Sequence, residues 1–278
     1  MDFGTETSLV QISDKEFREL VDFVYQRYGI DLTKKRQLVE GRLSHTLKSK
    51  GLTNFSSYMQ LVRADKSGNE LHAFLNKITT NHSYFARENE HFDFLMKTGL
   101  PYLEKTRRND LRIWRAGCSA GQEAYNIAMT MDQYFGPRKA SWDTTILATD
   151  ISTQVLDKAK EGIYSADVIK GLPSAWISQY FKKLPGGENY QVTEKIRKEV
   201  IFRIGNLMEP FQVKKPFDII FCRNVMIYFD AETSARLIEK FYQATAPGGY
   251  LFIGHSENVN REKTKYTYLR PAIFQKQP

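Results

Sequence analysis

Between residues 111 and 254, short apolar runs alternate with amphipathic helical patterns, and this alternation restricts the fold more than any other feature. Four such runs are evident: Leu111 to Ala116, Thr145 to Ala148, Phe217 to Cys222 and Tyr250 to Gly254. Strands that alternate with helices form a parallel sheet with right-handed crossover connections. The sequence therefore predicts an α/β domain, with ligands expected at the carboxyl ends of the strands.

An irregular stretch interrupts this alternation between the second and third runs. It contains the turn signal Pro185-Gly186-Gly187, followed by two short apolar segments, Tyr190 to Val192 and Val200 to Ile204. A turn flanked by short strands is typical of antiparallel pairing. We therefore expect a small antiparallel β-subdomain, at about residues 176–204, inserted into the larger domain.

The first hundred residues carry helical patterns instead. Ser13 and Glu16 form the capping-box pattern before an apolar stripe with helical spacing. Further helices are expected at Lys34 to Lys50, Phe55 to Arg63 and Asn69 to Thr79. The sequence predicts an all-helical domain over residues 1–88, a linker with connecting helices over 89–110, and the α/β domain over 111–278.

Small residues, Gly117 to Gly121, connect the first expected strand to a helix that begins near Gln122. Such a turn lets a ligand approach the backbone at the binding edge of an open sheet. The spacing differs from the G-x-G-x-x-G dinucleotide pattern, so a tight turn with a purely structural role remains an alternative.

The next strand ends at Asp150, about thirty residues further along the chain. A carboxylate at this position accepts hydrogen bonds from both hydroxyls of a ribose, which indicates NAD or S-adenosylmethionine. The absence of a pyrophosphate-binding pattern favours the ligand without phosphate. The alternative for Asp150 is an N-cap of the helix that begins near Thr153.

Two further segments carry polar groups suited to a crevice. Asn224 and Tyr228 follow the strand Phe217 to Cys222, and Arg87 lies in the polar segment that joins the two domains. An amide, an aromatic hydroxyl and a guanidinium can orient a polar or anionic substrate. The alternatives are a core position for Tyr228 and a surface salt bridge from Arg87 to Glu88 or Glu90.

Composition narrows the function classes. The two cysteines, Cys118 and Cys222, lack metal-ligand spacing, and so do His82, His91 and His255, so no metal or disulfide is expected. No segment approaches the about 20 apolar residues of a membrane span, and we expect a cytoplasmic protein. The net charge of +8 indicates an anionic partner without identifying it.

In combination, these segments resemble the CheR-type chemoreceptor glutamate methyltransferases over nearly the whole chain. The matching blocks are Ile78 to Asn81, Phe85 to Glu88 with His91-Phe92, Ala116 to Tyr125, Leu147 to Asp150, Gly205 to Leu207, Phe217 to Asp230 and Gly254 to Glu257. The resemblance implies a helical amino-terminal domain and a Rossmann-like methyltransferase domain with a small inserted β-subdomain.

The resemblance also implies a site for S-adenosylmethionine and its product S-adenosylhomocysteine. The cofactor-binding residues would be Asn81, Ser83, Arg87, Gly117, Glu123, Asp150, Asn206, Leu207, Asn224 and Val225. Arg87 and Tyr228 would lie nearest the chemistry. This sequence departs from the usual family pattern at Ala86, where an aromatic residue is common, at Gln122, where glutamate is common, and at Ser83, where threonine is commoner.

The implied reaction is esterification of glutamate side chains on the cytoplasmic helices of a methyl-accepting chemotaxis receptor. We expect these helices to meet the basic residues Lys34, Lys35, Arg42, His45 and Lys48, although a solvated charged face is the alternative. We expect a monomer that does not insert into the membrane. Two other functions remain open: a non-catalytic S-adenosylmethionine-binding scaffold, and a nucleic-acid methyltransferase, which the sequence does not favour because it shows no RNA-binding motif.

Overall fold

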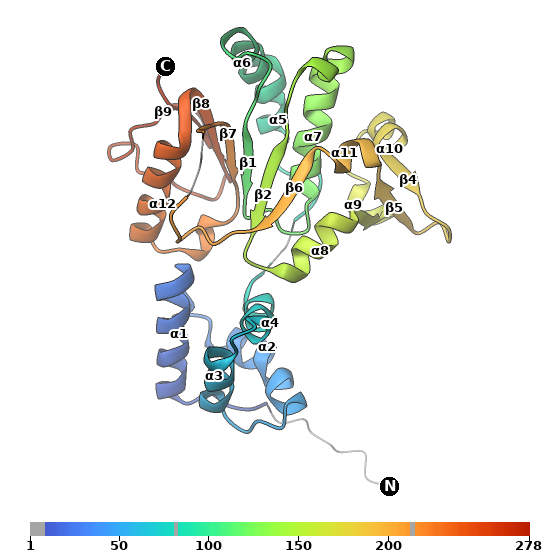
Figure 1. The fold of residues 1–278 in the computed structure, drawn as a ribbon. Helices are drawn as coiled ribbons and strands as arrows, with labels where there is room; N and C mark the ends of the chain where they lie inside the picture. Colours follow the sequence, from blue (N-terminus) through green and yellow to red (C-terminus); the bar gives the residue numbers. More distant parts are fainter. Residues whose placement is uncertain (1–8, 81–82, 212–214) are drawn as a thin grey trace. The chain divides into compact units, whose positions relative to one another are not determined.

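The computed structural model describes residues 9–80, 83–211 and 215–278. The chain divides into two compact units, Met1–Thr80 and Asn81–Pro278 (Figure 1). The boundary between the units thus precedes residue 88, where the sequence analysis placed the end of the helical domain. Each unit is described by itself below.

Within residues 9–80, the described part of the first unit, there are four helices: α1 (Asp14–Tyr28), α2 (Arg36–Ser49), α3 (Phe55–Ala64) and α4 (Asn69–Ile78). The predicted capping box is confirmed, because the Ser13 hydroxyl accepts from the Glu16 backbone N–H and the Glu16 carboxylate accepts from the Ser13 N–H. On α2, Val39, Leu43 and Leu47 are spaced four residues apart and are fully buried. The apolar faces of the helices therefore form the core of this unit, as the helical periodicity predicted.

The second unit is built on a seven-stranded sheet with the order β6-β2-β1-β7-β8-β10-β9. Its strands are β1 (Ile113–Ala116), β2 (Ile146–Asp150), β6 (Val200–Ile204), β7 (Phe217–Cys222), β8 (Thr245–Ile253), β9 (Thr267–Arg270) and β10 (Ile273–Gln275). The strands from β6 to β8 pair in parallel, which confirms the expected parallel sheet. The edge strands β10 and β9 pair antiparallel and were not predicted.

Helices cover both faces of this sheet (Figure 1). Apolar residues of α7 (Gln122–Phe135) share one buried cluster with Ile113 and Ile219, whereas those of α12 (Ala231–Ala244) share another with Trp114 and Ile220. Adjacent strand residues point to opposite faces, so α7 and α12 lie on opposite sides of β1 and β7. This is the layered arrangement of an α/β domain.

Shorter helical segments complete the second unit. α5 (Glu90–Phe94), the π-helical turn η1 (Leu95–Gly99) and α6 (Leu100–Thr106) precede β1. The remaining segments are the 3₁₀ turn η2 (Gly136–Ser141), α8 (Thr153–Glu161), α9 (Ala166–Ile169), α10 (Ser174–Tyr180), α11 (Glu194–Arg197) and the 3₁₀ turn η3 (Met226–Tyr228).

The expected small antiparallel sheet is present, but its strands are not all those predicted. It consists of β3 (Ile163–Ser165), β5 (Asn189–Val192) and β4 (Phe181–Lys183), in the order β3-β5-β4. Placing Val200 to Ile204 in this subdomain was wrong, because that segment is β6 and pairs in parallel with β2 at the edge of the main sheet. An apolar pattern indicates a strand without indicating which sheet the strand joins, and the three-residue β3 is too short to give a pattern.

Candidate functional site

The turn after β1 brings three strand ends together. The backbone N–H groups of Gly117 and Cys118 both donate to the Thr149 carbonyl at 2.8 Å. Gly117 has a φ of +72°, and a Cβ there would lie 2.4 Å from a methyl group of Val225. Packing against Val225 thus requires glycine at this position, and the turn holds the end of β1 against the segment after β7.

Asp150 is the last residue of β2 and is 8% exposed. Its Oδ2 accepts from the Ser119 N–H at 2.8 Å and its Oδ1 from the Ser152 N–H at 3.0 Å. Ser152, and not Asp150, caps α8, so the alternative of Asp150 as the N-cap is wrong. Burial raises the pKa of Asp150 against the opposing effect of these hydrogen bonds. The two oxygens offer about four lone-pair sites, more than these backbone N–H groups occupy, so the carboxylate can still accept from a ribose hydroxyl.

The turn after β7 carries Asn224 in the left-handed region, at a φ of +59°. The Glu257 carboxylate accepts from the N–H groups of Val225 and Met226, both at 2.7 Å, and from the Gly254 N–H. Burial raises the pKa of Glu257, although the backbone hydrogen bonds act in the opposite direction. Glu257 was not expected in the site, because no local sequence pattern indicates which backbone groups its carboxylate contacts.

A buried ion-pair network lies beneath the strand ends. The fully buried Arg223 guanidinium lies 3.1 Å from the Glu123 carboxylate and 3.2 Å from that of Glu88. The Arg115 guanidinium lies 2.6 Å from the other oxygen of Glu123. Glu123, expected to bind cofactor, is therefore held between two arginines, neither of which was predicted for the site. Buried charges are stable only when paired in this way.

Arg87 is positioned through its backbone by the same network, because Arg223 donates a hydrogen bond to the Arg87 carbonyl. The side chain of Arg87 is 23% exposed, and its Nε lies 3.8 Å from the Glu88 carboxylate. The guanidinium also lies 5.4 Å from the ring centroid of Tyr84. Ala86 and Glu88, on either side of Arg87, both have positive φ values, of 58° and 50°. Such backbone strain is concentrated at functional sites.

Two histidines lie next to Glu88, which sequence spacing did not indicate. Ligand atoms of Glu88, His91 and His255 fall within 4.8 Å of one another. Burial, with the nearby charges of Arg223 and His255, lowers the pKa of His91 to about 3. The Glu88 carboxylate is already paired with Arg223, whose positive charge opposes a metal ion at the same oxygens. The third histidine, His82, lies outside the described residues.

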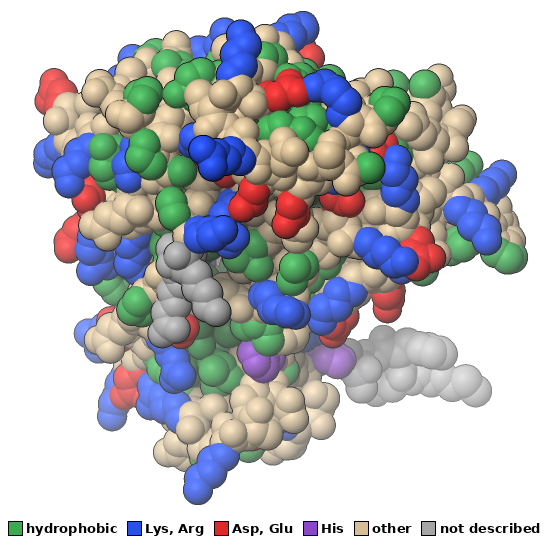
Figure 2. Space-filling view, turned by 45° about the horizontal axis from the view of Figure 1, so that its top comes forward, with side chains coloured by type: hydrophobic (Ala, Val, Ile, Leu, Met, Phe, Trp, Pro, Cys, Tyr) green, Lys and Arg blue, Asp and Glu red, His purple; other side chains and the backbone are tan. Residues whose placement is uncertain are grey.

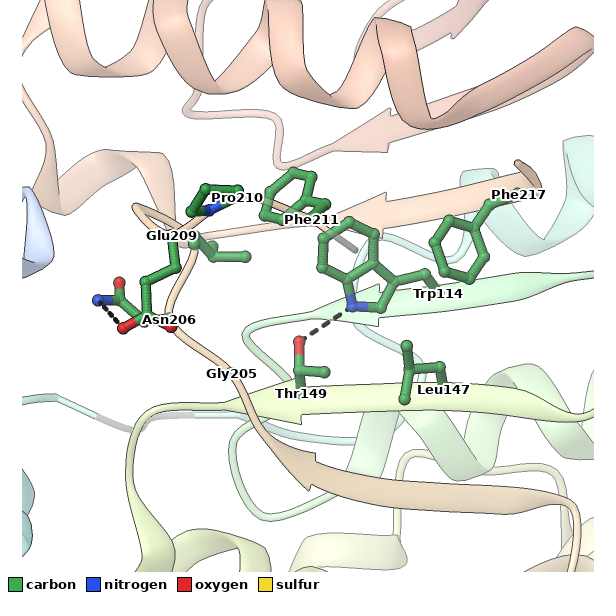
Figure 3. A pocket seen from close by; sticks show the side chains of 10 residues that line it. Trp114, Leu147, Thr149, Gly205, Asn206, Glu209, Pro210, Phe211 and Phe217 are labelled. Atoms are coloured by element: carbon green, nitrogen blue, oxygen red, sulfur yellow. Dashed lines mark hydrogen bonds between the residues drawn. The ribbon is translucent and has the colours of Figure 1, made fainter. Parts of the chain in front are cut away.

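A cavity of about 180 Å³ adjoins the end of β2 (Figure 3). Asn206 and Leu207 line it together with Trp114 and Thr149, whose side chains form a 2.9 Å hydrogen bond. The Gly205 N–H donates to the Asp150 carbonyl at 3.0 Å, which places the loop after β6 beside the end of β2. Two of the expected cofactor residues therefore line a cavity next to Asp150.

The strand ends thus bring together most of the expected cofactor residues: Gly117, Glu123, Asp150, Asn206, Leu207, Asn224 and Val225. Arg87 joins them through Arg223. Ser83 is half-buried in the segment before Arg87, and Asn81 lies outside the described residues. Tyr228 is half-buried at the end of η3, where its N–H donates to the Val225 carbonyl. A carboxylate, amides and a guanidinium fit the ribose, adenine and carboxylate of S-adenosylmethionine.

In the first unit, Lys34, Lys35, His45 and Lys48 are exposed. Arg42 has a structural contact instead: its guanidinium donates to the carbonyls of Lys77, Ile78 and Thr79 at the end of α4. Figure 2 shows basic side chains spread over the face in view, with acidic side chains among them. Among the described residues, no helix is long and apolar enough to span a membrane.

Comparison with known proteins identifies two family models. Residues 81–273 match "CheR methyltransferase, SAM binding domain", and residues 15–79 match "CheR methyltransferase, all-alpha domain". A chemotaxis protein methyltransferase of Borreliella burgdorferi is 42% identical over 273 residues, which cover 96% of each chain. The chemotaxis protein methyltransferase of Escherichia coli is 37% identical over 96% of this chain and 93% of its own length.

Proposed function

Because this chain belongs to the CheR methyltransferase family, we propose that it esterifies glutamate side chains on the cytoplasmic helices of a methyl-accepting chemotaxis receptor. The chain is an S-adenosylmethionine-dependent methyltransferase. Beyond this activity, we propose that the methylated group is a glutamate carboxylate and that the residues named below act on it. The observation that carries the proposal is that Arg223, which follows β7, donates to the Arg87 carbonyl, while Asp150 ends β2 of the same sheet and accepts from the turn after β1.

The chemistry requires little from the protein beyond positioning. S-adenosylmethionine supplies a methyl group on a sulfonium, so attack by a carboxylate oxygen forms a C–O bond, breaks the C–S bond and gives a methyl ester and S-adenosylhomocysteine. A glutamate carboxylate is already ionised at neutral pH, so no general base is required. Aligning two reactants in a near-attack geometry can contribute about 7 to 11 kcal/mol in favourable systems.

Arg87 would orient the reacting carboxylate. Its backbone carbonyl accepts from Arg223, and its side chain, which is 23% exposed, lies 3.8 Å from the Glu88 carboxylate and 5.4 Å from the Tyr84 ring centroid. A planar guanidinium presents parallel N–H groups that match the two oxygens of a carboxylate. Two parallel N–H groups of Arg87 would therefore meet the two oxygens of the reacting glutamate.

The remaining residues would bind the cofactor and shape the methyl site. Asp150 would accept from the ribose hydroxyls, and Asn206, Leu207, Asn224 and Val225 would surround the adenosine. Tyr228 follows this turn in η3 and would present its ring and hydroxyl toward the methyl group. Ala86 stands where an aromatic residue is usual in the family, so the side chain beside the methyl group would be smaller in this protein.

The receptor would reach the enzyme through the exposed basic residues Lys34, Lys35, His45 and Lys48, with Arg42 beside them. Complementary charge raises the rate of association with acidic receptor helices. We further propose that the protein acts in the cytoplasm as a monomer, with neither nucleic acid nor membrane lipid as its partner. The turn at Leu184 to Gly187 joins β4 to β5, so the β-subdomain offers only a short loop to a peptide. We therefore propose that the enzyme does not require a carboxyl-terminal receptor peptide as a tether.

Transfer of a radiolabelled methyl group to purified receptor fragments tests this function. We expect label on the receptor that is released by mild base, as a carboxyl ester is, and lost when the acceptor glutamates are changed to alanine. Base-stable label would contradict the ester. Tight S-adenosylmethionine binding without transfer to any candidate receptor would favour a scaffold, and transfer to RNA would favour a nucleic-acid methyltransferase.

A further inference from the structure

Glu257 is placed to control the shape of the turn that carries Asn224 and Val225. This turn has Asn224 in the left-handed region, at a φ of +59°, and Val225 in the right-handed helical region. Successive residues in these two regions point their N–H groups toward one side and form a small anion-binding concavity. In this protein, the anion in that concavity is the Glu257 carboxylate, which accepts from the N–H groups of Val225 and Met226 at 2.7 Å.

The second oxygen of the same carboxylate reaches a different strand end. Glu257 Oε2 accepts a 2.5 Å hydrogen bond from the Gly254 N–H, at the end of β8. A Cβ at Gly254 would lie 2.6 Å from the Asn224 side-chain nitrogen and 3.0 Å from Glu257 Oε2. The two turns are therefore in van der Waals contact, and the carboxylate joins them with three hydrogen bonds.

The turn that Glu257 holds is in contact with the rest of the proposed cofactor site. Val225 packs so closely on Gly117 that a Cβ at Gly117 would collide with its methyl group. A shift of the turn would therefore move Val225 relative to Gly117 and disturb the Gly117 to Gly121 segment, whose Ser119 N–H donates to Asp150. Because interiors are close-packed, such a shift cannot be absorbed without moving neighbouring groups.

The neighbouring residue His255 connects this turn to the Arg87 segment as well. The His255 backbone N–H donates to the Glu88 carboxylate at 3.2 Å, and Glu88 is adjacent to Arg87 and paired with Arg223. The segment Gly254 to Glu257 thus contacts two parts of the proposed site. Glu257 contacts the Asn224 to Met226 turn, and His255 contacts Glu88, next to Arg87.

We propose that Glu257 is a positioning residue, whose carboxylate fixes the Asn224 to Met226 turn in the shape that S-adenosylmethionine binding requires. The proposal rests on the proposed role of Asn224 and Val225 in cofactor binding. Glu257 touches neither reactant and acts through the backbone of the turn. Its negative charge matters as well as its shape, because three N–H donors converge on two oxygens.

Glutamine at position 257 separates charge from shape. One oxygen of Glu257→Gln can still accept hydrogen bonds, but the amide NH₂ must then face an N–H donor. We expect S-adenosylhomocysteine to bind the Glu257→Gln variant about 10-fold to 100-fold more weakly, because hydrogen bonds to a charged acceptor are lost. Glu257→Asp keeps the charge on a shorter side chain and should recover part of the affinity.

The experiment is calorimetric titration of the full chain with S-adenosylhomocysteine, well below the melting temperature of each variant. Glu262→Gln, an exposed glutamate on the following segment, is the matched control and should bind as the wild type does. In receptor methylation, Glu257→Gln should raise the KM for S-adenosylmethionine more than it lowers kcat, because Glu257 acts on the binding turn and not on the reacting atoms.

Two outcomes overturn the inference: unchanged affinity in Glu257→Gln, or weakening of Glu257→Asp equal to that of Glu257→Gln. If Glu257→Gln does not fold, Glu257→Asp is compared with the wild type instead. Unchanged affinity in Glu257→Asp would then count against the positioning role of Glu257. Asn224→Ala separates this inference from the proposed function. If Asn224→Ala weakens binding and Glu257→Gln does not, the role of Glu257 is rejected. If neither Asn224→Ala nor Glu257→Gln weakens binding, the turn is not part of the cofactor site.

Discussion

The carboxylate of Asp150 accepts a 2.8 Å hydrogen bond from the backbone N–H of Ser119, across the ends of β1 and β2. Ser119 has a φ of +51°, which is unfavourable for a residue with a side chain. The acidic side chain therefore supports the glycine-flanked turn in addition to its proposed contact with ribose. Replacement of Asp150 should affect both the ligand and the turn.

Asp150→Ala should weaken S-adenosylhomocysteine binding by about 1 to 3 kcal/mol, because bound hydroxyl groups lose their acceptor. Calorimetry measures this effect directly. Asp167→Ala, an exposed aspartate paired with Lys170, is the control and should leave affinity unchanged. A folded Asp150→Ala protein with wild-type affinity would remove Asp150 from the cofactor site and leave it the supporting role alone.

Arg87→Ala should lower kcat for receptor methylation about 10-fold to 100-fold, the loss expected for a hydrogen bond to a charged group, while the melting temperature changes little. Arg87→Lys should recover little activity, because an ammonium lacks the planar fork. Arg18→Ala, an exposed arginine of α1, is the control. Full activity in Arg87→Ala would reject the role of Arg87 in orienting the substrate carboxylate and would favour a structural salt bridge with Glu88.

Much of the fold could be predicted because its signals are local. The capping box at Ser13 and Glu16, the apolar stripe of α1 and the strand Phe217 to Cys222 depend on neighbours within one or two turns or along one strand. The placement of Asp150 at a strand end follows from the same local pattern. Wherever hydrophobic period and turn chemistry agree, the element is specified by its own residues.

The parts that could not be predicted depend on partners distant in the sequence. Glu88 and Arg223 form one ion pair, and Glu257 meets the N–H groups of Val225 and Met226, yet no local pattern couples these residues. The assignment of Val200 to Ile204 failed for the same reason, because strand pairing is decided by the tertiary structure. The ion pairs and hydrogen bonds that support the proposed site could therefore be identified only from the folded structure.

Changing Lys34, Lys35 and Lys48 together to glutamate should raise the apparent KM for receptor about 10-fold, equivalent to about 1.4 kcal/mol. The affinity for S-adenosylhomocysteine should stay unchanged, and methylation by the wild type should weaken with added salt. Reversing Lys160, Lys170 and Lys215, exposed lysines of the other unit, controls for net charge. If the first triple change has no effect, yet deletion of the receptor's carboxyl-terminal tail abolishes methylation, both the docking surface and the tether-free proposal are wrong.

His91 should make the second unit less stable as the solution becomes acidic. Burial and the charge of Arg223 lower the pKa of His91 to about 3, whereas an unfolded histidine titrates near 6.5. Between these values the unfolded chain binds a proton that the folded chain does not, so the free energy of unfolding falls as the pH falls from 6.5 toward 3. At pH 5 this contribution alone amounts to about 2 kcal/mol.

The measurement is urea unfolding at pH 7.5 and pH 5.0, followed by tryptophan fluorescence, since Trp114, Trp142 and Trp176 all lie in the second unit. His91→Gln cannot take up this proton, so its stability should fall less than that of the wild type between the two pH values. The carboxyl groups with raised pKa values, Asp150 and Glu257, are present in both proteins and cancel in the comparison. His45→Gln, on the exposed face of the first unit, should reproduce the wild-type difference. Equal losses in His91→Gln and the wild type would mean that His91 is protonated in the folded chain at pH 5, and that Glu88 pairs with it as well as with Arg223.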